Sequence, residues 1–426
     1  MFYSFIEIYK ELHFKLFLFL YSSVYCFGQV DSNQKIKIEM EIDSLINISI
    51  YEKAFPGAQI YFKLDDKIII NKSYGFHTYD SLIAVENDHI YDLASLTKVF
   101  ASTLAIMKIS EDYKINLNDP ISNYIKDLKR SNKKNTTFFE ALSHTSGWIP
   151  YISHQNFIKR KNEKLKTSVI RNEKTNRFNL MVSENLFLNK NYYKKLFKRI
   201  RKSKVENVGS YLYSGLFFFY VPEIIKKITG ENFEDYLNDT FFKSIENNSI
   251  MFSPLEKVNK KMIVPTEFDS IFRKLLIHGT VHDEAASLMG GISGNAGLFG
   301  NASGIGKLLD IIDPQNDNSV LNDSTLSKFT SYAYPNSSIR RGLGFDKPYQ
   351  FSNQGNYPNT NFSKNSFGHT GFTGTFFWVD PLKKIKIVFL TNRVYPSRKN
   401  EKLFDNEIRS KLIDILLTSS KSIQNE

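Results

Sequence analysis

The chain of 426 residues has a single cysteine, Cys26, and only two tryptophans. Cys26 lies in an apolar stretch near the N-terminus, 16–27, which we expect to be removed from the mature protein. Without it the chain has no thiol, which excludes disulfides and cysteine chemistry. No later apolar run approaches the about 20 residues that a membrane-spanning helix requires. The mature chain is therefore expected to have no transmembrane segment.

The N-terminus reads as an export signal. Two lysines precede the apolar stretch, and residues 26–28 place small side chains at the positions that a signal peptidase reads. We predict a signal peptide over 1–28 with cleavage before Gln29; two glutamates are unusual in its first part, so a later true start is an alternative. Tyr25 is bulky where lipid attachment needs a small residue, which favours simple cleavage over a lipid anchor. The protein is expected in the periplasm or outside the cell.

The formal net charge of +12 belongs to one segment. Between Lys159 and Glu206 there are 16 lysines and arginines against 4 aspartates and glutamates, so the rest of the chain sums to zero. A basic charge confined in this way does not indicate a nucleic-acid partner. We expect the basic insertion, about 157–206, to form a solvated lobe over part of the domain. The alternative is a surface for an anionic cell-envelope polymer.

Hydrophobic periodicity predicts secondary structure mainly near the two ends of the chain. We expect an amphipathic helix, two antiparallel hairpins and a last amphipathic helix, over Glu39–Ala54, Ala58–Tyr74, Phe376–Thr391 and Lys402–Leu417 respectively. The middle reads mostly as helix and loop. This pattern predicts one domain over 29–426 of the α/β class, α+β type, with an antiparallel sheet flanked by helices. Its sheet subdomain takes about 40–90 and 300–418, and a mostly helical subdomain takes about 91–299.

One of three S-x-x-K motifs has the surroundings of a catalytic pair. Two of them, at Ser32 and Ser131, lie in polar segments. Lys98 of the third is followed by side chains that are apolar nearly all round, which indicates a buried helix. Residues three apart share a helical face, so the amine of Lys98 can reach the Ser95 hydroxyl. A buried lysine needs a partner or loses its proton, and Ser95 would meet unpaired N–H groups at the helix start. The layout is that of an activated serine.

Three other patterns suggest functional sites less strongly. His144, in a turn of sequence HTSGW, is expected to be a hydrogen-bonded anchor rather than a catalyst. His278 and His282 are separated by glycine and β-branched residues and have no third ligand nearby, which argues against a metal site. The glycine-rich stretch 290–297 lacks the Lys-Ser/Thr ending of a phosphate loop and suits a pocket wall better. No metal or cofactor is expected.

Three motifs carry a family resemblance. After Ser95–Lys98 come Tyr213-Ser214-Gly215 and His369-Thr370-Gly371, with flanking stretches such as LNDPISNY, HGTVHDEAA and GHTGFTGT. Over about 40–418 the chain resembles the β-lactamase-related serine hydrolases on the class C side, which include D,D-carboxypeptidases, D-aminopeptidases and esterases. It is most similar to low-molecular-weight penicillin-binding proteins of type 4B. Each motif alone is weak, and the three in this order are specific.

The resemblance implies roles for these residues. Ser95 would be the nucleophile, Lys98 its base, and Tyr213 the group that shares the proton relay and protonates the leaving group. Substrate would be bound by His369, Thr370, Gly371 and Phe372, with His369 hydrogen-bonded to Tyr213. The oxyanion hole would consist of the backbone N–H groups of Ser95 and Phe372. Water would then hydrolyse the acyl-enzyme.

Gly215 departs from the family pattern, which usually has Asn or Asp at this position. The missing side chain would bond the substrate amide and Lys98, and Asn295 likewise stands where close relatives often have histidine. Strong β-lactamase activity is therefore not expected. We expect a D,D-carboxypeptidase-like enzyme acting on peptidoglycan stem peptides. The alternatives are an esterase of the same fold and an inactive member that binds wall fragments.

Overall fold

A computed structural model describes residues 35–245, 249–313, 315–316 and 319–424 of the chain. The predicted signal peptide and Cys26 lie outside the described residues. Within the described part, no helix combines the length and the apolar character needed to cross a lipid bilayer.

The centre of the fold is a five-stranded antiparallel sheet, built from the two predicted hairpins and one further strand. Its strand order is β2 (Lys67–Gly75), β1 (Gly57–Leu64), β11 (Ile385–Thr391), β10 (Phe376–Asp380) and β9 (Phe367–Thr370). The β1–β2 turn has positive φ angles at both Asp65 and Asp66, as a two-residue type I′ turn requires. Strand β1, from the N-terminal part of the chain, pairs with β11, from the C-terminal part. The expected antiparallel sheet is confirmed.

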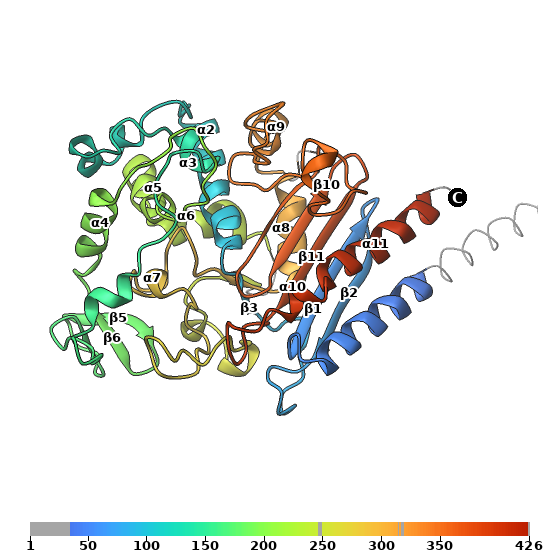
Figure 1. Ribbon diagram of the computed structural model, residues 1–426, viewed down its shortest axis with the longest axis horizontal. Helices are drawn as coiled ribbons and strands as arrows, with labels where there is room; N and C mark the ends of the chain where they lie inside the picture. Colours follow the sequence, from blue (N-terminus) through green and yellow to red (C-terminus); the bar gives the residue numbers. More distant parts are fainter. Residues whose placement is uncertain (1–34, 246–248, 314, 317–318, 425–426) are drawn as a thin grey trace, which may run out of the picture.

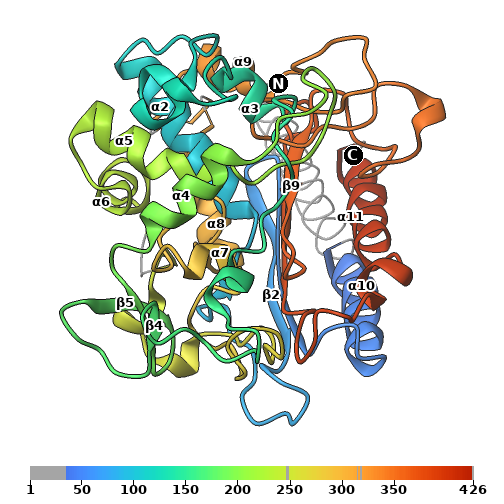
Figure 2. The ribbon, with the colours of Figure 1, turned by 60° about the vertical axis from the view of Figure 1, so that its left-hand side comes forward.

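Both faces of the sheet are covered by other elements. Successive side chains of a strand point to opposite faces, so they pack into two different hydrophobic cores. On β11, Ile387 and Phe389 pack with the terminal helices, whereas Val388 and Leu390 belong to the larger core on the other face. Figures 1 and 2 show the first and last helices side by side on one face. The first helix spans 35–51. The predicted last helix is instead two helices, α10 (Lys402–Asp405) and α11 (Ile408–Gln424), because Glu407 has a left-handed φ of 51°.

The opposite face carries the helical part of the chain. A π-helical segment, Lys98–Thr103, leads into α2 (Leu104–Asp112), and Phe100 packs on Phe377 of the sheet with ring centroids 4.6 Å apart. A small sheet of β3 (Tyr91–Asp92), β8 (Phe299–Gly300) and β7 (Ile250–Met251) closes the region near Ser95. Other α-helices of this part are α3 (Phe138–Leu142), α5 (Val221–Thr229), α6 (Phe233–Leu237), α7 (Glu284–Ser287), α8 (Ala302–Ile311) and α9 (Asp323–Thr330).

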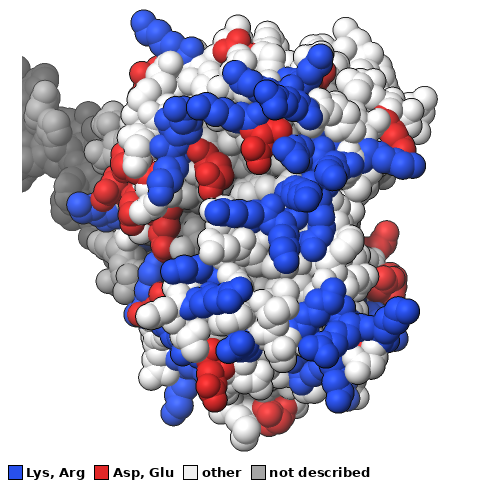
Figure 3. All heavy atoms as spheres, turned by 90° about the vertical axis from the view of Figure 1, so that its left-hand side faces the viewer, with Lys and Arg blue, Asp and Glu red and all other residues white. Residues whose placement is uncertain are grey.

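The basic insertion is a packed lobe. Its helix follows the helical spacing of Tyr192, Leu196, Phe197 and Ile200 in the sequence, whereas the sequence did not predict its small sheet. It contains a three-stranded sheet and a helix, namely β4 (Ile170–Arg171), β6 (Leu186–Asn189), β5 (Phe178–Ser183) and α4 (Tyr193–Lys202). The apolar face of α4, formed by Leu196, Phe197 and Ile200, is buried in the main core. Its lysines face outward, and Figure 3 shows Lys and Arg side chains gathered on this side of the molecule. The lobe is thus anchored to the domain and basic on its outer surface.

Candidate active site

The structure brings Ser95 and Lys98 into direct contact. The Nζ of Lys98 lies 2.8 Å from Ser95 Oγ, and it also donates to the backbone carbonyl of Asn295 at 2.9 Å. Lys98 is only 4% exposed, whereas Ser95 is half-buried and accessible. The predicted pairing across one helical turn is therefore present, with the amine buried and the hydroxyl open to a ligand.

A strained turn presents Ser95. The preceding residue, Ala94, has a φ of 47°, which is unusual for a residue with a side chain. The buried carboxylate of Asp92 holds this turn, because it accepts from the Ala94 N–H at 2.8 Å and from the His282 N–H at 2.6 Å. Burial raises the pKa of Asp92 against the opposing effect of these two bonds. Sequence reasoning missed Asp92, although an aspartate three residues before Ser95 in an apolar run was a signal.

The turn between β9 and β10 is bonded to the segment before Ser95. Thr373 Oγ1 donates to the Asp92 carbonyl at 2.8 Å, and Thr375 Oγ1 donates to the Leu93 carbonyl at 3.1 Å. Gly371 fits against the same backbone, since a Cβ there would lie 2.7 Å from the Leu93 oxygen. Among the described residues, nothing accepts a hydrogen bond from the N–H of Ser95 or of Phe372. Both donors therefore remain available to a ligand.

Tyr213 lies over Lys98 and beside His144. The Lys98 amine is 5.5 Å from the Tyr213 ring centroid, and the His144 and Tyr213 rings are 4.4 Å apart. His144 is buried and its Nδ1 accepts from the Ser214 N–H at 3.2 Å. Burial, followed by the charge of Arg341, lowers the pKa of His144 well below its usual value. His144 is a neutral anchor of the Tyr213 segment, as its turn predicted.

Gly215 lies against Lys98. A Cβ at this position would be 3.7 Å from Lys98 Cε, which is ordinary van der Waals contact, and would meet no other heavy atom within 4 Å. A side chain at 215 would thus project beside the amine, as the family pattern implies. The backbone of Asn295 takes part of that role here, through its carbonyl. Its side chain is instead bonded to Ser293 and Asp283.

The expected hydrogen bond between His369 and Tyr213 is absent among the described residues. Their ring centroids are 6.0 Å apart, His369 Nδ1 contacts the Thr370 carbonyl at 2.8 Å, and its buried Nε2 has no partner there. Burial, with the charge of Arg341, lowers the pKa of His369 well below its usual value, so the ring is neutral. His369 packs at the end of β9 near Tyr213, and the prediction of a bond between them is wrong in this state.

Phe372, the last predicted binding residue, has an exposed ring. It is 48% exposed and stacks on His282 with centroids 5.6 Å apart. His282 in turn contacts Glu267 at 2.7 Å, and Arg398 joins Glu267 at 2.7 Å to Glu284 at 2.8 Å. Burial alone would raise the pKa of Glu267, but bonds from His282 and Arg398 lower it to about 2.

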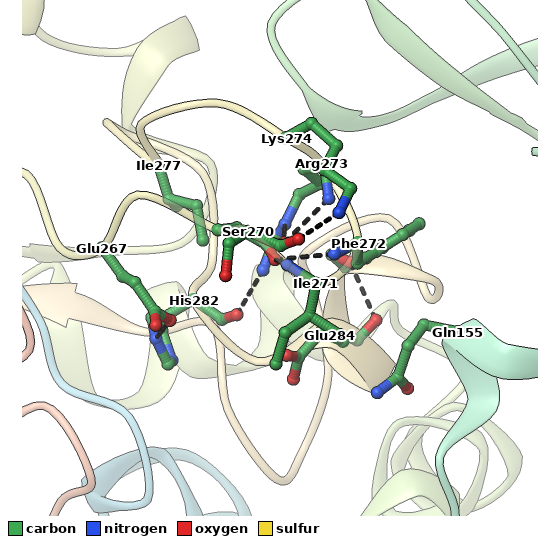
Figure 4. A network of polar contacts seen from close by, with 12 residues as sticks. Gln155, Glu267, Ser270, Ile271, Phe272, Arg273, Lys274, Ile277, His282 and Glu284 are labelled. Atoms are coloured by element: carbon green, nitrogen blue, oxygen red, sulfur yellow. Dashed lines mark hydrogen bonds and ion pairs between the residues drawn. The ribbon is translucent and has the colours of Figure 1, made fainter. Parts of the chain in front are cut away.

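The histidines of the 278–282 segment have structural partners. Figure 4 shows His282 beside Glu267, and Arg273 directed at the His282 carbonyl. His278 contacts the Ile263 carbonyl at 2.6 Å. Across the part of the chain that the structure describes, no group of three or more His, Cys, Asp or Glu side chains could hold a metal ion. The segment therefore supports the wall of the site on which Phe372 rests.

Known proteins resemble this chain in sequence and in fold. The chain is 26% identical over 401 residues to a Salmonella agona (strain SL483) protein named "Putative D-alanyl-D-alanine carboxypeptidase", covering 85% of this chain and 84% of the relative. Among solved structures, a class C β-lactamase aligns with a TM-score of 0.63 at 16% identity, covering 89% of this chain and 98% of that one.

Two further solved structures share the fold. EstCE1, described as a hydrolase with promiscuous acyltransferase activity, gives a TM-score of 0.65 at 14% identity over 90% of this chain and 99% of that one. An octameric penicillin-binding protein homologue from Pyrococcus abyssi gives 0.59 at 20% identity, over 86% and 77% respectively. The sequence profile of the β-lactamase family matches residues 34–409. The chain therefore belongs to the β-lactamase family and has the fold of these solved structures.

Proposed function

We propose that this protein is a serine hydrolase that forms an acyl-enzyme on Ser95. The observation that carries the proposal is the 2.8 Å contact between Ser95 Oγ and the buried amine of Lys98. A serine hydroxyl needs an adjacent base, and a neutral Lys98 amine can accept its proton across this contact as Oγ attacks a carbonyl carbon. The carbonyl of Asn295 holds the amine in place by accepting one of its N–H bonds.

The remaining steps use groups around the same point. The free N–H groups of Ser95 and Phe372 would stabilise the tetrahedral oxyanion, which typically contributes about 3 kcal/mol for each donor. Tyr213, over the Lys98 amine, would return the proton to the leaving group. The acyl group then stays on Ser95 Oγ until a water molecule, deprotonated by the same relay, releases it and restores the hydroxyl.

For the substrate we propose a peptide ending in D-Ala-D-Ala, as in cell-wall stem peptides. The name of the Salmonella relative supports this class. The position of His369-Thr370-Gly371 at the end of β9, which is an edge strand of the sheet, also supports it. One observation favours an ester as the second candidate. Gly215 offers no side-chain group for the substrate amide, and an ester does not need one. An exported enzyme fits the first class, and we propose action outside the cytoplasm.

Hydrolysis of two substrates tests this assignment. A synthetic peptide ending in D-Ala-D-Ala and p-nitrophenyl butyrate should be compared on the wild type, Ser95→Ala and Lys98→Met. Release of D-Ala by the wild type alone supports the peptidase, and release of p-nitrophenol alone supports the esterase. Turnover of neither, combined with binding of the wild type to isolated peptidoglycan, would instead support a family member that only binds wall fragments.

The basic lobe is proposed to bind an anionic cell-envelope polymer. Support comes from its outer surface, where α4 presents Lys194, Lys195 and Lys198 to solvent. None of these three lysines forms an ion pair with a carboxylate among the described residues. Such a surface would hold the enzyme near its polymeric substrate through salt-sensitive attraction.

A further inference from the structure

A cavity of about 520 Å³ lies away from Ser95, at the other end of the β10–β11 hairpin. Thr375, just before β10, contacts the Ser95 segment, whereas Asp380, the last residue of β10, lines the cavity. The five residues of β10 separate the two sites by roughly 16 Å at about 3.3 Å per residue. The cavity is within the size range of about 300–1,000 Å³ typical of small-molecule sites.

The walls of the cavity are mainly apolar. They are formed by side chains from α8, α9 and the sheet, namely Leu309, Ile312, Leu326, Phe367, Val379 and Ile385. Such a lining favours a ligand with an apolar body, since burying that body removes apolar surface from water.

Most charged groups at the rim already have partners. Lys386 pairs with Asp313 at 2.9 Å, and Lys63 lies 3.5 Å from Asp66. The carboxylate of Asp380 accepts from the backbone and side chain of Ser363, each at 2.7 Å. These groups already have partners within the protein and leave little demand for a charged ligand.

Lys347 is a buried lysine of the cavity lining that has no carboxylate partner among the described residues. Its side chain is buried at 1% exposure, its Nζ donates to the Asn365 carbonyl at 3.1 Å, and it lies 4.9 Å from the Tyr332 ring centroid. All three of these residues line the cavity. Within the described residues, no carboxylate lies within ion-pair distance of this amine. Burial lowers the pKa of Lys347 to about 7, against the opposing charge of Asp380.

An ammonium group buried without a counter-charge is costly, and an anion in the cavity would supply the missing partner. The carboxylates of Asp313, Asp323 and Asp380 in the same lining would repel a ligand with two negative charges. We propose that this cavity binds a small amphiphile with an apolar body and a single carboxylate, which pairs with the amine of Lys347. This site is separate from Ser95 and does not depend on the proposed hydrolysis.

Calorimetric titration of the full chain with decanoate tests the proposal. Lys347→Met keeps the length of the side chain and removes the charge, and Lys328→Met is a matched change on α9 outside the cavity lining. We expect wild type and Lys328→Met to bind decanoate equally, and Lys347→Met to bind at least tenfold more weakly. Decyltrimethylammonium, with the same chain and the opposite charge, should not bind.

A second variant keeps the test decisive if Lys347→Met does not fold. Leu326→Trp adds bulk to the cavity from α9 while Lys347 stays in place, and it should also weaken decanoate binding at least tenfold. Ser95→Ala should bind as the wild type does, whatever its activity. The proposal is overturned if the wild type does not bind decanoate, if Lys347→Met or Leu326→Trp binds it unchanged, or if the cationic amphiphile binds equally well.

Discussion

The effect of restoring an amide at Gly215 can be worked out from the structure. A Cβ at this position makes one ordinary contact, 3.7 Å from Lys98 Cε, and the Gly215 backbone is not in the left-handed region. Gly215→Asn should therefore fit without displacing its neighbours. It would place a carboxamide beside the Lys98 amine and the path of the substrate carbonyl.

The expected gain is that of one new hydrogen bond in the transition state. A net contribution of about 0.5–1.5 kcal/mol corresponds to an acylation rate roughly two- to tenfold higher. Gly215→Ala adds the same Cβ without the amide, so it should acylate within about twofold of wild type. The assay is the second-order rate constant for labelling by a fluorescent penicillin, measured for all three proteins under one set of conditions.

Two results would refute this reasoning. If Gly215→Asn and Gly215→Ala react at the same rate, the amide does not reach the reacting groups. If both variants are slowed tenfold or more, the Cβ is not accommodated beside Lys98, and the contact on which the argument rests is wrong.

Three further perturbations have defined outcomes. Gly371→Ala would place a Cβ 2.0 Å from Thr375 Oγ1, so it should displace the Phe372 N–H and lower acylation by about 100-fold; unchanged labelling would contradict this. Lys347→Met should raise the free energy of unfolding below pH 7 by up to about 5 kcal/mol, because burial lowers the wild-type pKa of Lys347 from 10.5 to about 7. Above pH 7 the Lys347 side chain loses its proton in the folded wild type and keeps it in the unfolded chain, so the stability gained by the variant should shrink towards pH 10.5. Urea unfolding at pH 6, 8 and 10 measures this difference between the two proteins, and a difference that stays constant with pH would contradict the prediction. Replacing Lys194, Lys195 and Lys198 together by Gln should lower the salt concentration that elutes the protein from heparin–agarose, and an unchanged elution would exclude α4 as the binding surface.

The sheet was predictable because its strands carry their own local signals. The β1–β2 hairpin has a two-residue turn between apolar runs, and β11 alternates strictly between two cores. The small sheet of the basic lobe was not predictable, since its strands are two to six residues long in a sequence dominated by Lys and Asn. The break at Glu407 depends on a single left-handed residue without a glycine to mark it.

In the candidate site, contacts between residues close in the sequence were predictable, whereas contacts between residues far apart were not. The contact between Ser95 and Lys98 follows from their spacing on one helix, so the motif alone predicted it. His369 is buried and its Nδ1 contacts the Thr370 carbonyl rather than Tyr213, which the motif alone cannot express. Asp92 was missed because it acts on the backbone of His282, 190 residues away in the sequence.

The central claim is that Ser95 is the acyl-accepting nucleophile. Intact-protein mass spectrometry after incubation with a penicillin and, separately, with a fluorophosphonate tests it most directly, with peptide mapping of any adduct. We expect one adduct per chain with at least one reagent, located on the peptide that contains Ser95 and absent from Ser95→Ala. An adduct that persists in Ser95→Ala, or no adduct on the wild type with either reagent, would contradict it.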